Sequence, residues 1–138
     1  MIRRAALAAA LLPLPAQAML APCYYAEALR AATIVVQAAP VSIGAPDDQG
    51  WCAVEAKVLR SFAGPLAEGD SLTTALPCRQ PEGIVGPVHW SDLATLQATR
   101  VLELHLNADF SVAGYGAGLQ VMDATSAAPV VVAGPPCD

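Results

Sequence analysis

The sequence is poor in the side chains from which most catalytic and nucleic-acid-binding sites are built. It contains two histidines, His89 and His105, a single lysine, Lys57, and only 5% aromatic residues. No GxSxG motif and no CxxC or HxxxH spacing is present. These deficits argue against a nucleophile triad, against a zinc site and against a platform on which bases or sugars stack. We therefore expect a protein that is not an enzyme and that needs neither a cofactor nor a metal.

The first residues are arranged like a secretory signal. Arg3 and Arg4 form a short basic region, residues 5–14 an apolar stretch, and residues 16–18, Ala-Gln-Ala, a cleavage site. The apolar stretch is too short to span a bilayer, so no membrane insertion is expected. Residues 1–18 are therefore predicted to be a signal peptide, and the mature protein to be periplasmic or secreted.

The predicted mature chain, residues 19–138, is acidic and has the length of one domain. Without Arg3 and Arg4, five basic residues stand against twelve acidic ones, a net charge of −7. Nucleic acids and anionic membranes are bound by clustered Lys and Arg, so neither is an expected partner. Residues 20–23, Leu-Ala-Pro-Cys, leave open a lipid anchor on Cys23, although Pro22 stands where that processing uses a small residue.

Four cysteines in an exported chain indicate two disulfides, for which three connectivities exist: Cys23, Cys52, Cys78 and Cys137. Strand-like runs at residues 52–62 and 71–76 flank a turn segment rich in glycine. If this hairpin turns at residues 65–66, paired residue numbers sum to about 130 and Cys52 lies beside Cys78. Cys23 and Cys137 are then left to join the two ends of the chain.

Hydrophobic periodicity predicts the remaining elements. A helix is expected at residues 24–31, another starting at Ser91 and Asp92, and further strands at residues 32–41, 100–107 and 110–122. A short edge strand is also expected at residues 130–132. The second strand loses its alternation at Leu59 and Arg60, which predicts a β-bulge there.

The alternation in residues 100–107 predicts a strand with one face toward solvent. Leu102, Leu104 and Leu106 share one face, and Glu103, His105 and Asn107 share the other. His89 and His105 are accordingly interpreted as ordinary surface histidines, and Glu103 as a possible cross-strand partner of Lys57. In the last strand Gly114, Gly116 and Gly118 share a face, which indicates a close approach by another backbone or a sharp bend.

Five strands with a helix before the fourth are the order of an oligonucleotide/oligosaccharide-binding (OB) barrel. Three features carry a resemblance to a known family. They are residues 54–73, VEAKVLRSFAGPLAEGDSLT; residues 90–106, WSDLATLQATRVLELHL; and Cys23 before the strand AATIVVQAA. In these features the chain resembles the netrin-like domain family. That family includes the tissue inhibitors of metalloproteinases and bacterial relatives. The resemblance implies a mainly β, disulfide-stapled, five-stranded OB-like barrel with one or two short helices, over residues 19–138.

The resemblance also implies an alternative activity, inhibition of a metalloproteinase through an N-terminal CxC whose first cysteine chelates the zinc. Here Cys23 is followed by Tyr24 and Tyr25, so this mechanism is assigned to no residue. Our main expectation is a non-enzymatic binding or accessory module of the cell envelope with an unknown protein partner. Candidate binding residues are the following: Trp51, Trp90, His105 and Tyr115. The competing interpretation is that the two tryptophans only cover the ends of the barrel.

Overall fold

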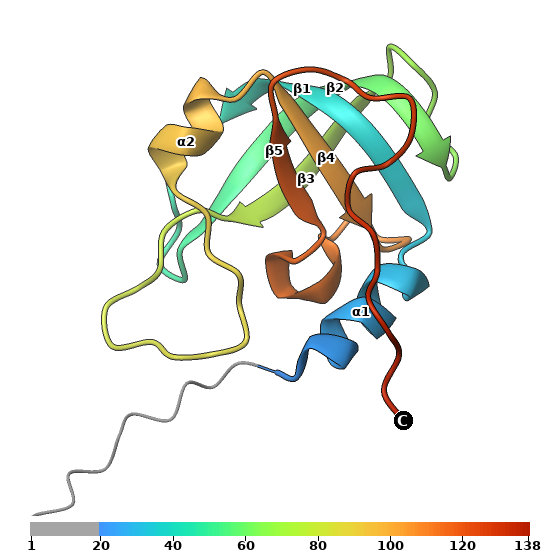
Figure 1. Ribbon diagram of the computed structural model, residues 1–138. Helices are drawn as coiled ribbons and strands as arrows, with labels where there is room; N and C mark the ends of the chain where they lie inside the picture. Colours follow the sequence, from blue (N-terminus) through green and yellow to red (C-terminus); the bar gives the residue numbers. More distant parts are fainter. Residues whose placement is uncertain (1–19) are drawn as a thin grey trace, which may run out of the picture.

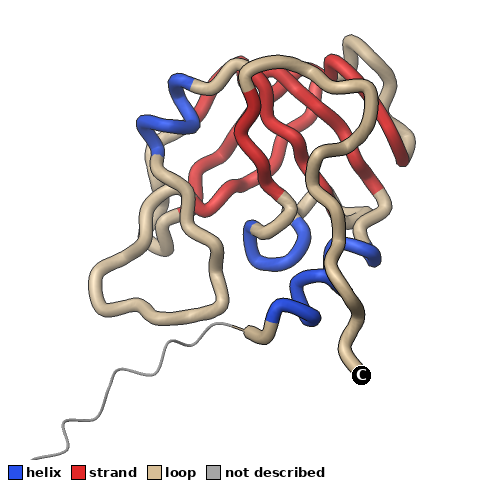
Figure 2. Tube along the Cα trace, in the orientation of Figure 1, coloured by secondary structure: helices blue, strands red, loops and turns tan. Residues whose placement is uncertain are grey.

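A five-stranded antiparallel sheet organises residues 20–138, the part of the chain that the computed structural model describes (Figure 1, Figure 2). The predicted signal peptide, residues 1–18, lies outside the described residues. The elements in chain order are α1 (Pro22–Ala31), β1 (Ile34–Ile43), β2 (Trp51–Ala63), β3 (Ser71–Pro77), α2 (Leu93–Ala98), β4 (Val101–Leu106), the 3-10 turn η1 (Ala113–Gly116) and β5 (Leu119–Met122). Two helices, two disulfides and a mainly β fold are therefore confirmed.

The strands lie in the order β3-β2-β1-β4-β5, and the sheet is not closed into a barrel. The edge strand β3 nevertheless lies close to the connection between β4 and β5. Thr74 of β3 donates its hydroxyl to the carbonyl oxygen of Phe110 at 2.7 Å. Side-chain and backbone contacts, rather than a strand ladder, thus bring β3 near the β4–β5 connection.

One face of the sheet forms the hydrophobic core. Residues of alternating position are buried there, including Val54, Val58, Leu72, Leu102 and Leu104. This is the period-two pattern of a strand with one face inward, as predicted. Each such side chain contributes roughly 1.5–3 kcal/mol when it leaves water. No helix among residues 20–138 has the length and apolar character needed to cross a bilayer.

The predicted bulge in β2 is confirmed. Gln37 of β1 pairs with Arg60 and Ala38 pairs with Val58, so Leu59 is the extra residue between them. The predicted hairpin register is wrong by two residues, because Cys52 pairs with Leu76 and not with Cys78. Cys78 lies just beyond the end of the ladder and still reaches Cys52, with a Cα–Cα distance of 5.8 Å.

The prediction that β4 has one wet face is wrong, because β4 is buried on both sides. Glu103 is 0% exposed and His105 is 7% exposed. The covering segment is residues 123–138, which we call the C-terminal strap and which Figure 1 shows passing in front of β4 and β1 toward α1. The expected edge strand at residues 130–132 does not form, since the strap contains no strand or helix.

The predicted long strand at residues 110–122 is also wrong. Gly114, Tyr115 and Gly116 have φ angles of 62°, 53° and 97°, so the chain winds through η1 before β5 begins. The close approach predicted for the glycines does occur. A Cβ on Gly116 would lie 2.7 Å from the carbonyl oxygen of His89, and one on Gly118 would lie 2.6 Å from that of His105.

The ends of the described chain are joined at α1. Cys23, in the first turn of the helix, is bonded to Cys137 with a Cα–Cα distance of 4.9 Å. This is the predicted pairing, and it leaves no sulfur on Cys23 for a thioether lipid anchor. The backbone N–H of Cys137 donates to Glu27, and Arg30 donates to the carbonyl oxygen of Gly134, so α1 holds the last residues of the strap.

Candidate functional site

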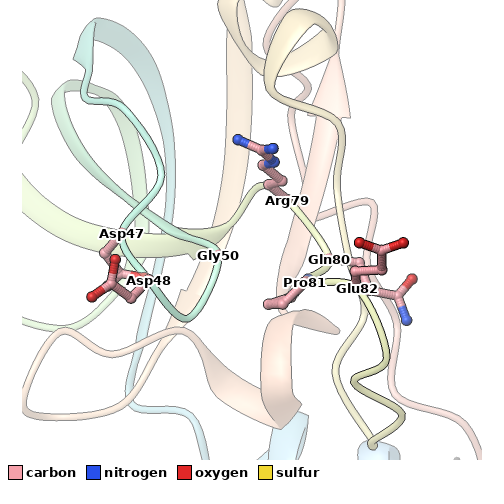
Figure 3. A pocket seen from close by; sticks show the side chains of 7 residues that line it. All are labelled: Asp47, Asp48, Gly50, Arg79, Gln80, Pro81 and Glu82. Atoms are coloured by element: carbon pink, nitrogen blue, oxygen red, sulfur yellow. The ribbon is translucent and has the colours of Figure 1, made fainter.

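Two loops at one end of the sheet form a cleft of about 440 Å³ (Figure 3). The loop before β2 contributes Asp47, Asp48 and Gly50, and the loop after β3 contributes residues 79–82. Figure 3 shows the two aspartates on one side of the cleft and Arg79 on the other, with Gln80 and Glu82 directed away from the aspartates. The residues that line the cleft thus include three acidic ones, Asp47, Asp48 and Glu82, and one arginine, Arg79.

Gly50 fixes the distance between the two loops. Its carbonyl oxygen accepts hydrogen bonds from the backbone N–H groups of Cys78 at 2.9 Å and Arg79 at 3.1 Å. Its φ is 87°, and a Cβ there would lie 1.9 Å from the carbonyl oxygen of Arg79. Only glycine combines this backbone conformation with this contact. The cleft thus has a rigid floor beside the Cys52–Cys78 disulfide.

Asp47 shapes the loop before β2. One carboxylate oxygen accepts hydrogen bonds from the backbone N–H groups of Gln49 and Trp51, each at 2.9 Å. Bonds from an aspartate side chain to nearby backbone N–H groups are typical of turns. The Asp47 carboxylate is therefore engaged by the backbone, whereas Asp48 and Glu82 extend from the exposed parts of the two loops.

The loop after β3 is braced at its base and projects at its tip. At the base, His89 N–H donates to Tyr115, Ser91 N–H donates to Pro77, and the hydroxyl of Tyr25 donates to Pro87 at 2.6 Å. At the tip, residues 80–86, the side chain of Gln80 donates to the carbonyl oxygen of Ile84. Figure 1 shows this segment standing out from the body of the protein.

Two aliphatic side chains are exposed at the tip of this loop. Ile84 is 52% exposed and Val85 is 65% exposed. Aliphatic side chains presented on a braced loop and flanked by charged groups are typical of protein–protein contact sites.

Two of the four candidate binding residues lie beside this cleft. Trp51 and Trp90 pack edge to face with ring centroids 6.5 Å apart, and both are partly exposed. A Cβ on Gly50 would lie 2.9 Å from the Trp90 ring, so Trp90 rests on the cleft floor. The pair therefore supports the two loops and also presents aromatic surface next to them.

The other two candidate residues are placed elsewhere. Tyr115 is 53% exposed in η1, and its carbonyl oxygen accepts a hydrogen bond from the His89 N–H at the base of the loop. His105 is buried under the C-terminal strap. The four residues therefore do not form one surface, and the interpretation of His105 as a surface histidine is wrong.

His89 is exposed, as predicted for a surface histidine, and one side of its ring packs against Tyr25. The ring centroids are 4.4 Å apart in an edge-to-face arrangement. Both residues line an apolar groove of about 500 Å³ that also includes Leu20, Pro22 and Leu29. The imidazole is thus part of an apolar wall and has no acidic partner among its described contacts.

A buried polar cluster on β1 and β4 has no counterpart in the sequence analysis. Glu103 accepts four hydrogen bonds, from Gln37 at 2.8 Å and from His105, Val130 N–H and Val131 N–H, each at 2.9 Å. Gln37 in turn contacts Ser126 through its side-chain amide. The predicted Glu103–Lys57 pair is absent from these contacts because β1 lies between β2 and β4. The cluster anchors the strap.

The hydrogen bonds to Glu103 set its protonation. Burial alone raises the pKa of the carboxyl group. The hydrogen bonds from Val130, Gln37, His105 and Val131 outweigh this effect and lower its pKa below the ordinary value. The carboxylate is therefore ionised at neutral pH.

This lowered pKa predicts a loss of stability in acid. A carboxyl group with a lower pKa in the folded state stabilises the protein fully above its unfolded pKa, which is about 4.3 for glutamate. That stabilisation is lost as the pH falls through the lower folded-state value. We expect the difference in unfolding free energy between the wild type and Glu103→Gln, measured by urea titration, to shrink as the pH falls from about 5.5 to below about 4. A difference that stays constant down to pH 3 would contradict the assignment.

All four cysteines are in disulfides, and residues 20–138 contain no cluster of three or more histidine, cysteine or acidic side chains suited to a metal ion. The end of the sheet that carries the loops before β2 and after β3 has a polar cleft, an aromatic pair and two exposed aliphatic side chains. This arrangement is suited to binding another macromolecule.

Comparison with protein-family models, with curated proteins and with solved structures found no match to this chain.

Proposed function

We propose that this protein is an exported, non-enzymatic binding module of the cell envelope, and that loop residues 80–86 and the adjoining cleft contact its partner. The observation that carries this proposal is the exposure of Ile84 and Val85 on a loop whose base is fixed by three hydrogen bonds. A fixed base reduces the conformational entropy lost on binding. The expected partner is a protein with an apolar pocket for these two side chains.

The negative charge of this protein indicates which chemical groups its partner would carry. Asp48 and Glu82 are exposed on the two loops, and the predicted mature chain has a net charge of −7. A partner whose apolar pocket is flanked by Lys or Arg matches this surface, because opposite charges at the rim raise the rate of association.

Two observations support export. The chain has two disulfides, which persist in oxidising compartments such as the periplasm and the cell exterior. Residues 1–18 have the pattern of a signal peptide. Periplasmic or secreted localisation is part of the proposal.

The proposed fold is an OB-like barrel of the netrin-like type. Its support is the strand order, the position of α2 before β4 and the contact of Thr74 with Phe110 across the open side of the sheet. In OB folds ligands meet a face of the sheet and the loops between strands 1 and 2 and between strands 4 and 5; here the loop between β1 and β2 supplies Asp47, Asp48 and Gly50 to the cleft.

Site-specific photo-crosslinking tests the proposed surface. A photoreactive amino acid at Val85 should give a covalent adduct with one envelope protein, and the same amino acid at Val41 should not. Val41 is a matched control because it is 64% exposed, against 65% for Val85, and lies on β1. Equal adducts at both positions, or none at either, would exclude loop 80–86 as the binding surface.

Introducing a charge at the apolar contact provides a second test. Ile84→Asp should weaken binding of the cross-linked partner at least tenfold, because an aspartate would enter an apolar pocket. The change should alter the unfolding free energy by no more than about 0.5 kcal/mol, since the side chain is exposed. Unchanged affinity, measured by titration calorimetry, would contradict the proposal.

The metalloproteinase-inhibitor alternative has a distinct requirement. Zinc chelation of the family's type needs a mature chain that begins with cysteine, whereas Leu20, Ala21 and Pro22 precede Cys23. N-terminal sequencing of the mature protein separates the two functions. A start at Met19 would exclude that mechanism, and a start at Cys23 would favour it over the binding module.

A further inference from the structure

The C-terminal strap is attached mainly through its backbone. Ser126 N–H donates to Gln37, and the N–H groups of Val130 and Val131 donate to the two oxygens of Glu103. The strap's own apolar side chains contribute little, because Val130 is 47% exposed and Val132 is 81% exposed. The strap therefore lies over the sheet without adding to its core.

A groove runs along one side of the strap. A groove of about 840 Å³ separates strap residues Thr125 and Ala127 from the bulged part of β2, which contributes Leu59, Arg60 and Phe62. Few buried apolar contacts and an open margin are the properties of a segment that detaches at low free-energy cost.

The two disulfides differ in accessibility. Cys52 and Cys78 are 0% and 2% exposed within the core, whereas Cys23 and Cys137 are both partly exposed at the surface. Thiol–disulfide exchange needs direct access of a thiolate to a sulfur atom. The terminal disulfide is therefore the one that an external reductant reaches first.

We propose that the strap is a redox-released cover, which detaches from β1 and β4 when a dithiol reduces Cys23–Cys137 and thereby exposes Gln37, Glu103 and His105. A thiolate of the dithiol attacks one cysteine sulfur, the S–S bond breaks, and the other cysteine leaves and takes up a proton. The second thiol of the reductant then resolves the mixed disulfide, releases the first cysteine as a thiol and converts the reductant into its own disulfide. Two electrons and two protons pass to the protein.

After reduction only hydrogen bonds hold the strap: those of Ser126, Val130 and Val131 to the polar cluster, and two more near its end. Arg30 donates to Gly134 and Glu27 accepts from Cys137, both at the surface. Surface contacts of this kind typically stabilise by less than about 1 kcal/mol. Without the covalent bond, only these hydrogen bonds oppose local opening of the strap, which is therefore more frequent than in the oxidised protein while the core under β4 stays folded.

The uncovered surface has a defined chemistry. It presents the Glu103–His105 pair, the Gln37 amide and, from the neighbouring strands β2 and β5, Arg60 and Gln120, which are the register partners of Gln37 and Glu103. The proposal does not rest on the binding role of loop 80–86, since none of these residues lies in that loop.

Selective reduction of the full chain tests the release. The protein is treated with limiting dithiothreitol, its free thiols are alkylated and mapped by mass spectrometry, and amide hydrogen exchange is followed by region. We expect alkylation of Cys23 and Cys137 before Cys52 and Cys78. We also expect at least tenfold faster exchange at Ser126, Val130 and Val131, with exchange in β4 unchanged.

Every other result overturns the proposal. Equal alkylation of all four cysteines would mean that accessibility does not select the terminal disulfide. Unchanged exchange in the strap would mean that the polar cluster suffices to retain it. Loss of protection in β4 as well would mean that the disulfide maintains the whole domain.

A variant separates the effect of the bond from that of the reductant. The double change Cys23→Ser and Cys137→Ser should show the faster strap exchange without reductant, and dithiothreitol should add nothing further in the strap. Slow exchange in this variant, or failure of its β4 to show protection, would exclude a locally released cover.

Discussion

Replacement of Glu103 with alanine is expected to lower the unfolding free energy by about 3–5 kcal/mol, the cost of removing one partner from a buried charged network. The side chain is 0% exposed and accepts hydrogen bonds from Gln37, His105, Val130 and Val131. Alanine would leave four donors inside the protein without an acceptor, and each buried unpaired group is unfavourable. Urea or guanidinium titration at pH 7 measures the loss.

Two variants make this result specific to the network. Glu55→Ala on β2 removes an exposed carboxylate and should change the unfolding free energy by no more than about 0.5 kcal/mol. Glu103→Gln keeps the shape and one acceptor oxygen, so its loss should be smaller than that of Glu103→Ala. Equal losses for alanine and glutamine, or a loss below about 1 kcal/mol for alanine, would show that the cluster does not stabilise the fold.

The second large effect is expected from the internal disulfide. Changing both Cys52 and Cys78 to alanine should destabilise the protein by about 3.5 kcal/mol on the chain-entropy model for their separation of 26 residues. The double change leaves no unpaired thiol in the core. Thermal and denaturant unfolding, compared with the oxidised wild type, measure the difference.

Loss of this disulfide should also be measurable locally, in the loop beside the cleft. The disulfide is next to Gly50, whose carbonyl oxygen accepts from Cys78 and Arg79, so its loss should also loosen the loop after β3. Hydrogen exchange at the Cys78 and Arg79 amides should rise relative to that of β4. Stability within about 1 kcal/mol of the wild type, or unchanged exchange at these amides, would contradict the structural role of the bond.

Features that depend on neighbouring residues in sequence were predictable. The bulge at Leu59 follows from a break in alternation, and the start of α2 follows from Asp92, whose carboxylate accepts from the Thr95 N–H. The disulfide pairing also followed from the hairpin, because an error of two residues in register still leaves Cys78 within reach of Cys52.

The burial of Glu103 and His105 could not be predicted in the same way. Polar residues alternating with leucines normally indicate a solvent face. Here that face is covered by residues 27 and 28 positions later, and they bind Glu103 through backbone N–H groups. Backbone donors are present in every sequence, so no side-chain pattern marks the covering segment.

The misplaced strand at residues 110–122 has a different cause. The alternation of small and apolar residues is compatible with a strand, but the chain uses Gly114 and Gly116 for positive φ angles. Tyr115 shares this left-handed conformation and becomes exposed in η1, far from the extended arrangement that placed it among the binding residues. Of the residues at or beside the cleft, the sequence singled out Trp51 and Trp90 as candidates, but it predicted neither their contact with each other nor the projecting loop.

The Cys23–Cys137 bond also determines how the protein responds to mechanical tension. Force applied to the two ends of the described chain passes through this one covalent bond, which spans a sequence separation of 114 residues and joins Cα atoms 4.9 Å apart. The hydrogen-bonded strands between these cysteines bear none of it. While oxidised, the domain would behave as a short inextensible link. Once reduced, the same chain would place its sheet directly under load.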